Sequence, residues 1–556
     1  MSDRTDLPAL QNDATTHHDE RPPRSRDIAL SLVSHTNAGK TTLARTLLGR
    51  DVGEVRDAPH VTEFADAHTL LETPAGERLR LWDTPGFGDS ARLVKRLRGA
   101  ERPLLGFLAE TWDRWRDRPF WASQQALRNV RDEADAMLYL VDASQSPEAA
   151  AYVAPEMELL GWVGKPVIVL LNQLGAPRSA TSGPDADEAR WRRHLAGFAI
   201  VRAVLPLDAF ARCWVQEQAL LGAVQAALPA AQHELMARLR AAWFERRVAT
   251  FEASMQQLAA SLARSALSAE PLPDKGSLKT RIRQAGAAIG LGQADPTPAV
   301  LAQKTLADGL EAEARANTLA LIRLHGLGGT AERDVLERIA RQVEMRVRLD
   351  ETQAALWGGA VTGALVGLKA DVLSGGLTLG GGLLTGGLLG ALGSAGLARG
   401  VNVLRGTDRS VVAWKAEALD AMVEAALLRY LAVAHFGRGR GDWAQGEAPP
   451  HWHGVVTEAL APYHEALAAA WADRDSGRRE ARDELKDRHG EHGDGGDGGD
   501  GGRGDGAGGR GDGAASNAIA SRLRPIVREA AWTALVHLYP DAGMAAEPPA
   551  LEGNMP

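Results

Sequence analysis

The stretch SHTNAGKTT, residues 34–42, combines small residues, a lysine and three threonines in the spacing of a phosphate-binding loop. It follows the apolar run IALSLV and precedes the helical pattern LARTLLGR, so it lies between a strand and a helix. In such a loop, backbone N–H groups close around a phosphate, and the positive end of the following helix points at it. The sequence therefore predicts a nucleotide-binding site.

The pattern G-x-x-x-x-G-K-[ST] is met by Gly39, Lys40 and Thr41, but Ser34 stands where its first glycine belongs. This departure is small, because the second half of the loop carries the ammonium and hydroxyl groups that meet phosphate and Mg²⁺. We predict that the nucleotide is contacted by Ser34, Asn37, Ala38, Gly39, Lys40, Thr41 and Thr42.

A second motif, WDTPGFGD at residues 82–89, directly follows the apolar run ERLRL. Asp83 at the strand end is placed to hold Mg²⁺, and the Gly86 amide to meet a γ-phosphate, so that this segment changes on hydrolysis. Between the motifs, Thr62 in DAPHVTE is placed to contact Mg²⁺ from a loop. The predicted metal ligands are Thr41, Thr62 and Asp83, and the predicted catalytic residues are Lys40, Thr62 and Gly86.

The elements that must position these residues extend from Asp27 to about Leu228, where short apolar runs alternate with helical patterns. This alternation predicts an α/β fold with a mostly parallel sheet and flanking helices. A long segment at 99–132, rich in tryptophan, predicts a helical insert packed on the sheet, with a partner-docking surface as the alternative. Beyond Leu228 long helical patterns follow, among them 234–267, and no further strand is predicted.

Taken together, SHTNAGKTT, the threonine of APHVTE and DTPG resemble the Era-like branch of the translation-factor-related GTPases. The layout as a whole resembles an uncharacterised bacterial family in which an Era-like G domain precedes a domain of unknown function. The resemblance implies a molecular switch that hydrolyses GTP to GDP with Mg²⁺. It also implies nucleotide and Mg²⁺ contacts for Lys40, Thr41, Thr62, Asp83 and Gly86.

The predicted organisation is an α/β P-loop G domain followed by an α-helical C-terminal region. The expected units are a tail (1–26), the G domain (27–228), a helical domain (229–350), a Gly-rich apolar hairpin (351–400), the helical domain continued (401–475), a low-complexity linker (476–515), a C-terminal helix (516–540) and a tail (541–556).

The base-recognition motif departs from the family pattern, because residues 172–175 read NQLG where guanine-specific G domains have N-K-x-D. The missing carboxylate would accept two hydrogen bonds from guanine, each worth about 1.5–3 kcal/mol, so we expect lower selectivity over adenine. Asn172 is expected to contact the base or the phosphate-binding loop, and Gln173 is expected to cover one face of the base. Asp208 is a candidate replacement for the carboxylate. GTP is the expected nucleotide by resemblance, with ATP or relaxed specificity as alternatives.

Intrinsic hydrolysis is expected to be slow, because Phe87 follows Gly86 and cannot orient the attacking water as a glutamine does. A homodimer partner through the G domain, an outside arginine or K⁺ could supply the missing group. Asn37 stands where potassium-stimulated Era-like proteins carry a cation-binding asparagine, which makes K⁺ a candidate cofactor. The alternative is that Asn37 stabilises the turn. A nucleotide-binding scaffold with negligible hydrolysis, attached to a membrane or not, is the competing class.

Charge and composition narrow the partners. The net charge of -8 gives no general attraction to nucleic acid, and no nucleic-acid partner is evident. With a single cysteine, Cys213, and no apolar core in the first residues, the cytoplasm is the expected compartment. The Gly-rich segment 352–398 is long enough to contact or enter a membrane. Its ten glycines over 372–398 dilute its hydrophobicity, so a buried helical hairpin is the alternative.

Overall fold

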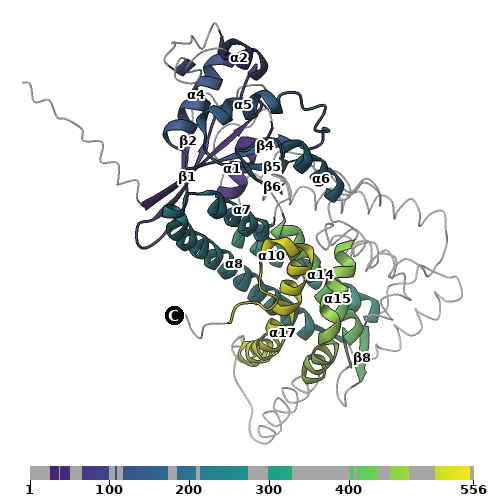
Figure 1. Cartoon of the computed structure of the whole chain (residues 1–556). Coiled ribbons are helices and arrows are strands. Elements are labelled where there is room, and N and C mark those ends of the chain that lie inside the picture. The colour runs from purple at the N-terminus through teal and green to yellow at the C-terminus, as the bar shows by residue number, and fades with distance from the viewer. Residues whose placement is uncertain are drawn as a thin grey trace, which may run out of the picture.

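The computed structural model in Figure 1 places an α/β unit above a helical unit. The structure describes residues 26–36, 38–49, 66–98, 107–108, 117–172, 184–207, 213–272, 298–327, 401–405, 410–435, 451–474 and 508–550.

A six-stranded sheet forms the centre of the α/β unit, in the order β2-β3-β1-β4-β5-β6. All neighbours pair in parallel except β2, which runs antiparallel to β3 at the edge. The inner strands read as continuous apolar runs because both faces of the sheet are covered. The prediction of a mostly parallel sheet is confirmed. The strands are β1 (Asp27–Ser34), β2 (Asp66–Glu72), β3 (Arg78–Asp83), β4 (Ala136–Asp142), β5 (Val167–Asn172) and β6 (Val201–Pro206).

Helices cover both faces of this sheet, as the prediction required. One face packs against α1 (Lys40–Leu48), α7 (Trp214–Ala227) and the first half of α8 (His233–Leu267). The other face packs against α2 (Ser90–Leu97), α4 (Arg118–Asp132), α5 (Val153–Val163) and α6 (Pro184–Leu195). Helix α4 is the described part of the tryptophan-rich insert, and its Trp121 is buried.

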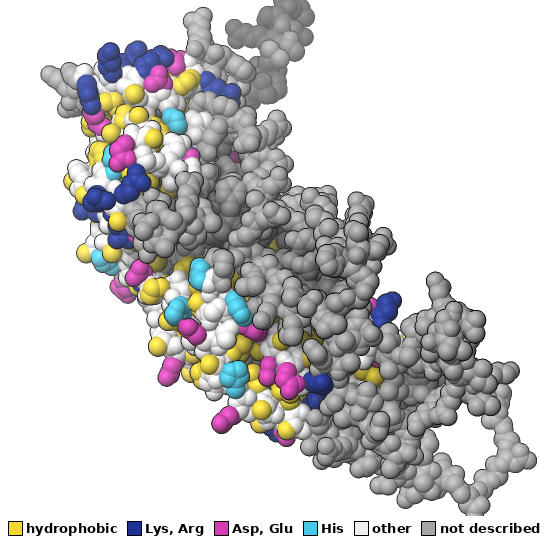
Figure 2. Space-filling view, turned by 90° about the vertical axis from the view of Figure 1, so that its right-hand side faces the viewer, with side chains coloured by type: hydrophobic (Ala, Val, Ile, Leu, Met, Phe, Trp, Pro, Cys, Tyr) yellow, Lys and Arg dark blue, Asp and Glu magenta, His cyan; other side chains and the backbone are white. Residues whose placement is uncertain are grey.

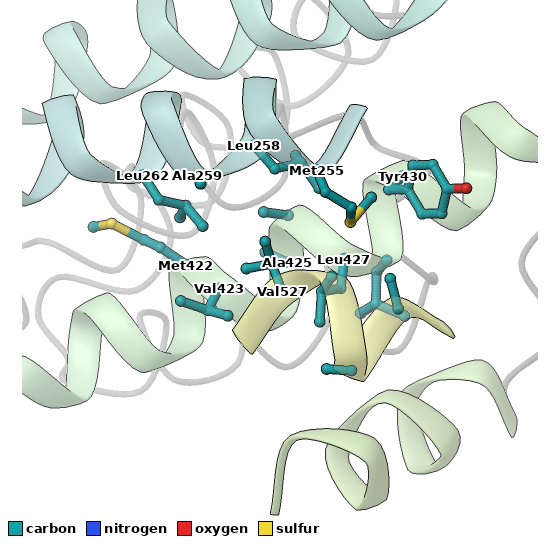
Figure 3. Close-up of a cluster of buried hydrophobic side chains, with 14 of the residues drawn as sticks. Met255, Leu258, Ala259, Leu262, Met422, Val423, Ala425, Leu427, Tyr430 and Val527 are labelled. Atoms are coloured by element: carbon teal, nitrogen blue, oxygen red, sulfur yellow. The ribbon is translucent and has the colours of Figure 1, made fainter. Parts of the chain in front are cut away.

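The helical unit has its own hydrophobic core, shown in Figure 3. Side chains from α8, α14 and α17 meet there, including Met255, Met422 and Val527. The predicted helix 234–267 is present as α8. The remaining elements of the unit are α10 (Pro298–Leu324), α14 (Ala416–Ala434), α15 (His451–Leu460), α17 (Gly508–Leu538) and the short 3₁₀ helices η2 (Ala230–Gln232), η4 (Ala461–Tyr463) and η5 (Pro540–Ala542).

A small antiparallel sheet also lies in this part, so the prediction of no strand beyond Leu228 is wrong. Its order is β7 (Ala269–Leu272), β9 (Ser410–Trp414) and β8 (Val401–Arg405). Residues 411–414, VVAW, carry β-branched and aromatic side chains that suit a strand. Because β9 pairs with β7, a segment far away in the sequence, local periodicity did not reveal it.

Helices α7 and α8 join the two units. In the first half of α8, Leu239 and Trp243 belong to the core under the sheet. In its second half, Phe251 and Met255 belong to the core of the helical unit. Glu217 of α7 is buried and accepts a hydrogen bond of 2.6 Å from the Trp243 indole. Arg247 binds both oxygens of the same carboxylate, at 2.8 and 2.9 Å. A paired buried carboxylate thus fixes the two helices where they pass between the units.

Charge is unevenly distributed on the face shown in Figure 2. Lys and Arg side chains gather toward the upper end of this face, whereas Asp, Glu and His side chains are more frequent over its lower part. In the part of the chain that the structure describes, no helix is long and apolar enough to cross a membrane. The Gly-rich segment 352–398 lies outside the described residues.

Candidate nucleotide-binding site

The phosphate loop runs from the end of β1 to the first turn of α1. Gly39 caps the helix with φ of +95°, a left-handed conformation that costs L residues free energy and favours glycine. A Cβ atom at this position would lie 2.7 Å from Asn172 Nδ2, so the site also requires glycine sterically. The first turn of α1 holds no acidic residue. The helix therefore presents its positive end to the loop, as anion binding requires.

Lys40 is buried beside the loop, and its Nζ donates a hydrogen bond of 2.9 Å to Ser34 Oγ. The serine at the first loop position thus serves as a partner of the ammonium group. Burial lowers the pKa of Lys40, while Asp83 and Glu156 nearby raise it. The two carboxylates therefore help to keep the lysine charged where a phosphate would meet it.

Asp83, at the end of β3, lies next to the first turn of α1. Thr41 Oγ1 donates a hydrogen bond of 2.6 Å to Asp83 Oδ2, while Asp83 Oδ1 is buried without a hydrogen-bond partner. Burial raises the pKa of Asp83 to about 6, although the Thr41 hydrogen bond and Lys40 lower it. A hydroxyl and a carboxylate with a spare buried oxygen form the kind of oxygen-only donor set that Mg²⁺ prefers. These two residues fit a magnesium ion.

Gly86 lies against the loop. A Cβ atom there would be 2.9 Å from Thr36 Cα and 3.1 Å from Lys40 Nζ, so only glycine fits without displacement. The next residue continues the contact, because Phe87 N–H donates to the Ser34 carbonyl at 2.9 Å. In return, the Thr36 amide and hydroxyl donate to the Phe87 carbonyl at 3.2 and 2.8 Å.

The Phe87 ring is fully buried in the core that α2, α4 and α5 share with the sheet. An aromatic residue at this position therefore anchors the DTPG segment to the sheet and the loop. This anchoring role was not apparent from the sequence, where Phe87 was interpreted only as the absence of a water-orienting group.

Asn172, at the end of β5, contacts the loop. Its Nδ2 donates a hydrogen bond of 2.9 Å to the Ala38 carbonyl, and the side chain is fully buried. Of the two roles expected for Asn172, the loop contact is the one observed. The base end continues into Gln173 and Gly175, which lie outside the described residues, as does Asp208.

The structure brings most of the predicted residues to one point, the N-terminus of α1. Those it places there are Ser34, Ala38, Gly39, Lys40, Thr41, Thr42, Asp83, Gly86 and Asn172. Asn37 and Thr62 lie outside the described residues. Sequence reasoning missed His35 and Glu156, which contact each other beside the loop. The helix VAPEMELLGWV carries two carboxylates, Glu156 and Glu158, and the sequence alone does not show that Glu156 is the buried one.

Comparisons with known proteins point to the same site. Residues 29–173 match a family model described as 50S ribosome-binding GTPase, and residues 341–491 match a domain of unknown function, DUF3482. No curated protein matches the chain.

Solved structures of Era are similar at the level of the fold. Era in complex with MgGDPNP and nucleotides 1506–1542 of 16S ribosomal RNA is 18% identical over 37% of this chain and 57% of that chain, with a TM-score of 0.27. An Aquifex aeolicus Era variant bound to GDP.AlF4- is 19% identical over the same shares, with a TM-score of 0.26. The match thus spans little more than half the length of the Era chains.

The fold, the loop and the family match define the N-terminal unit as a P-loop GTPase domain, a GTP-binding fold. More narrowly, the GTPase family match covers residues 29–173, and the match to a domain of unknown function covers residues 341–491 in the C-terminal region.

Proposed function

We propose that this protein is a Mg²⁺-dependent GTPase that cycles between GTP and GDP as a molecular switch. The observation that carries the proposal is the convergence of Lys40, Thr41, Asp83 and Gly86 at the N-terminus of α1. In this proposal Lys40 and the loop amides hold the β- and γ-phosphates, and the Gly86 amide senses the γ-phosphate.

Thr41 and Asp83 are proposed to hold Mg²⁺, and Thr62 is proposed as a further ligand from its loop. When bound, the ion would neutralise charge on the phosphate oxygens. The protein's own part is to align the phosphates: the loop amides fix their position, and the ammonium group of Lys40 compensates their charge.

A second candidate function is nucleotide binding with negligible hydrolysis. The observation that favours it is Phe87, whose ring is buried in the core and whose backbone is tied to the loop. The apolar side chain of Phe87 cannot orient the attacking water, so hydrolysis would depend on a polar group from elsewhere. K⁺ near Asn37 and a homodimer partner are proposed sources.

The helical unit is proposed to read the nucleotide state. Support comes from α7 and α8, which contribute side chains to both hydrophobic cores. A change in the packing of the α/β unit would therefore reach the helical unit through two packed helices. Membrane contact through 352–398 stays a prediction.

Phosphate release from GTP and from ATP, in K⁺ and in Na⁺ buffers, tests the proposal with wild type and Lys40→Ala. We expect slow release from GTP, faster in K⁺ if Asn37 holds the cation, and at least a hundredfold loss in Lys40→Ala. Release that survives the lysine change would overturn the assigned site. Tight GTP binding without release, lost in Lys40→Ala, would select the second candidate.

A further inference from the structure

A buried carboxylate outside the predicted site contacts the phosphate loop. Glu156 lies in the first turn of α5, where the positive end of a helix favours a carboxylate, and it is fully buried. His35, the second residue of the loop, places Nδ1 2.7 Å from Glu156 Oε1. Tyr139 of β4 donates a hydrogen bond of 2.6 Å to the other oxygen.

The two hydrogen bonds leave each oxygen of the carboxylate with a partner. An ionised carboxylate only accepts hydrogen bonds, so the imidazole is the donor when Glu156 is charged. Burial raises the pKa of Glu156, and His35, Tyr139 and Lys40 lower it. Burial has the larger effect, so the pKa of Glu156 is raised on balance, and its contacts with His35 and Tyr139 offset only part of that rise.

The His35 ring is also held from its side. It stacks on Tyr152, with ring centroids 4.5 Å apart and planes 20° apart. Tyr152 is the N-cap residue of α5, so the His35 ring contacts the same helix end that carries Glu156. On the backbone, His35 pairs with Phe87 as an isolated parallel bridge. Helix α5, the loop and the DTPG segment therefore meet at His35.

We propose that Glu156 is a positioning residue of the nucleotide site, which holds the phosphate loop in its binding conformation through His35. The proposal rests on the proposed function, because it needs the loop to bind nucleotide phosphates. A loop whose backbone is already fixed binds its ligand without the entropic cost of ordering. Glu156 touches no phosphate in this account, since it acts only through the histidine.

A double-mutant cycle on nucleotide affinity tests this coupling. Fluorescent GTP and ATP analogues are titrated against wild type, His35→Ala, Glu156→Leu and the double variant. We expect each single change to weaken both analogues about tenfold, because the loop reads phosphates and not the base. The double variant should lose no more than either single one. Losses that multiply to about a hundredfold would overturn the proposal, because independent effects add in free energy.

Two further variants separate loop positioning from a general packing role. Tyr139→Phe removes the other hydrogen bond to Glu156 without touching the loop, and its affinity should stay within threefold of wild type. His35→Asn retains a donor near the Nδ1 position and should also stay within threefold. If Tyr139→Phe weakens binding as much as Glu156→Leu does, or if His35→Asn is as weak as His35→Ala, Glu156 acts through the core.

Should Glu156→Leu fail to fold, judged by circular dichroism and thermal unfolding, Glu156→Gln replaces it in the same cycle. Its effect should vanish in the His35→Ala background, and an effect that persists there would overturn the proposal. Wild type and Lys40→Ala are measured alongside. If wild type shows no binding that depends on Lys40, the proposed function itself fails; if it does and the His35 and Glu156 effects multiply, only this inference fails.

Discussion

At the phosphate end of the site, side-chain hydrogen bonds join β1, α1 and β3, whereas at the base end the described contact runs from β5 to the loop. Lys40 bonds Ser34, Thr41 bonds Asp83, and Gly86 packs on Thr36. Asn172, from the motif that reads the base in guanine-specific G domains, donates to the Ala38 carbonyl of the loop.

We infer from this difference that recognition of phosphate and recognition of base are separable in this domain. In the proposed site, the contacts at the phosphate end are ones that any nucleoside triphosphate would use. Base choice depends on the segment after Asn172, where Gly175 stands in place of a carboxylate. Substitutions at the phosphate end should therefore weaken GTP and ATP binding equally. Substitutions at the base end should change the ratio of the GTP and ATP affinities.

The largest effect is expected for Gly39→Ala. A side chain must adopt φ near +95° and enter a space 2.7 Å from Asn172 Nδ2. Left-handed strain costs about 1–2 kcal/mol and overpacking about 1–3 kcal/mol. We expect GTP and ATP affinities to fall together by roughly a hundredfold or more, measured by titration calorimetry. Gly49→Ala is the matched control, since its φ is also positive but no atom lies within 4 Å. Selective loss of GTP alone would contradict the comparison.

Asp83→Asn should remove a pH dependence of stability. Because the pKa of Asp83 is raised to about 6, the folded state binds more protons than the unfolded state between about pH 4 and pH 6. Wild-type stability should therefore fall as pH rises through this window, by up to about 3 kcal/mol, with no further change from this group above it. Urea unfolding without nucleotide or Mg²⁺, at pH 4.5 to 7.5, measures the slope. An unchanged slope in the variant would show that Asp83 does not titrate this way.

Gly175→Asp should change base choice without changing phosphate binding. A carboxylate that accepts two hydrogen bonds from guanine, each worth about 1.5–3 kcal/mol, should raise the GTP-to-ATP affinity ratio at least tenfold. ATP affinity should remain within about threefold of wild type. Gly175→Asn is the control, because it has similar size without the charge. If Asp208→Ala in the wild-type background already abolishes guanine preference, Asp208 supplies the carboxylate and the gain at 175 should be small.

The smallest effect is expected for Asn172→Ala. Loss of the bond to Ala38 and of a fully buried side chain should weaken GTP and ATP about tenfold each, since both depend on the loop. Competition binding with the two nucleotides gives the ratio directly. A loss restricted to GTP would show that Asn172 reads the base and that the two ends are not separable.

The sequence predicted the α/β unit well because its signals are local. Short apolar runs gave the six strands, and the order of the SHTNAGKTT and DTPG motifs along the chain placed Lys40 and Asp83 at adjoining strand ends. Helix α8 followed from its periodicity. These features depend on residues within one element or on the geometry of a parallel sheet.

What the sequence could not supply are contacts between distant elements. Glu156 lies 121 residues from His35, and no sequence pattern in either segment predicts that the two side chains are in contact. In the same way β9 pairs with β7, which lies far away in the sequence, and the contact of Asn172 with the loop depends on where Ala38 lies. Phe87 was interpreted through the residue it replaces, whereas burial in the sheet core explains its presence.

Helix α8 has a mechanical consequence. Its 35 residues give a length of about 52 Å. Both ends are embedded, one under the sheet and one among α10, α14 and α17, so the helix transmits rotation as a rigid lever. A tilt of about 5° at the sheet would displace the far end by about 4.5 Å, nearly one helical turn. A small tilt of α8 at the sheet would thus become a larger displacement within the helical unit.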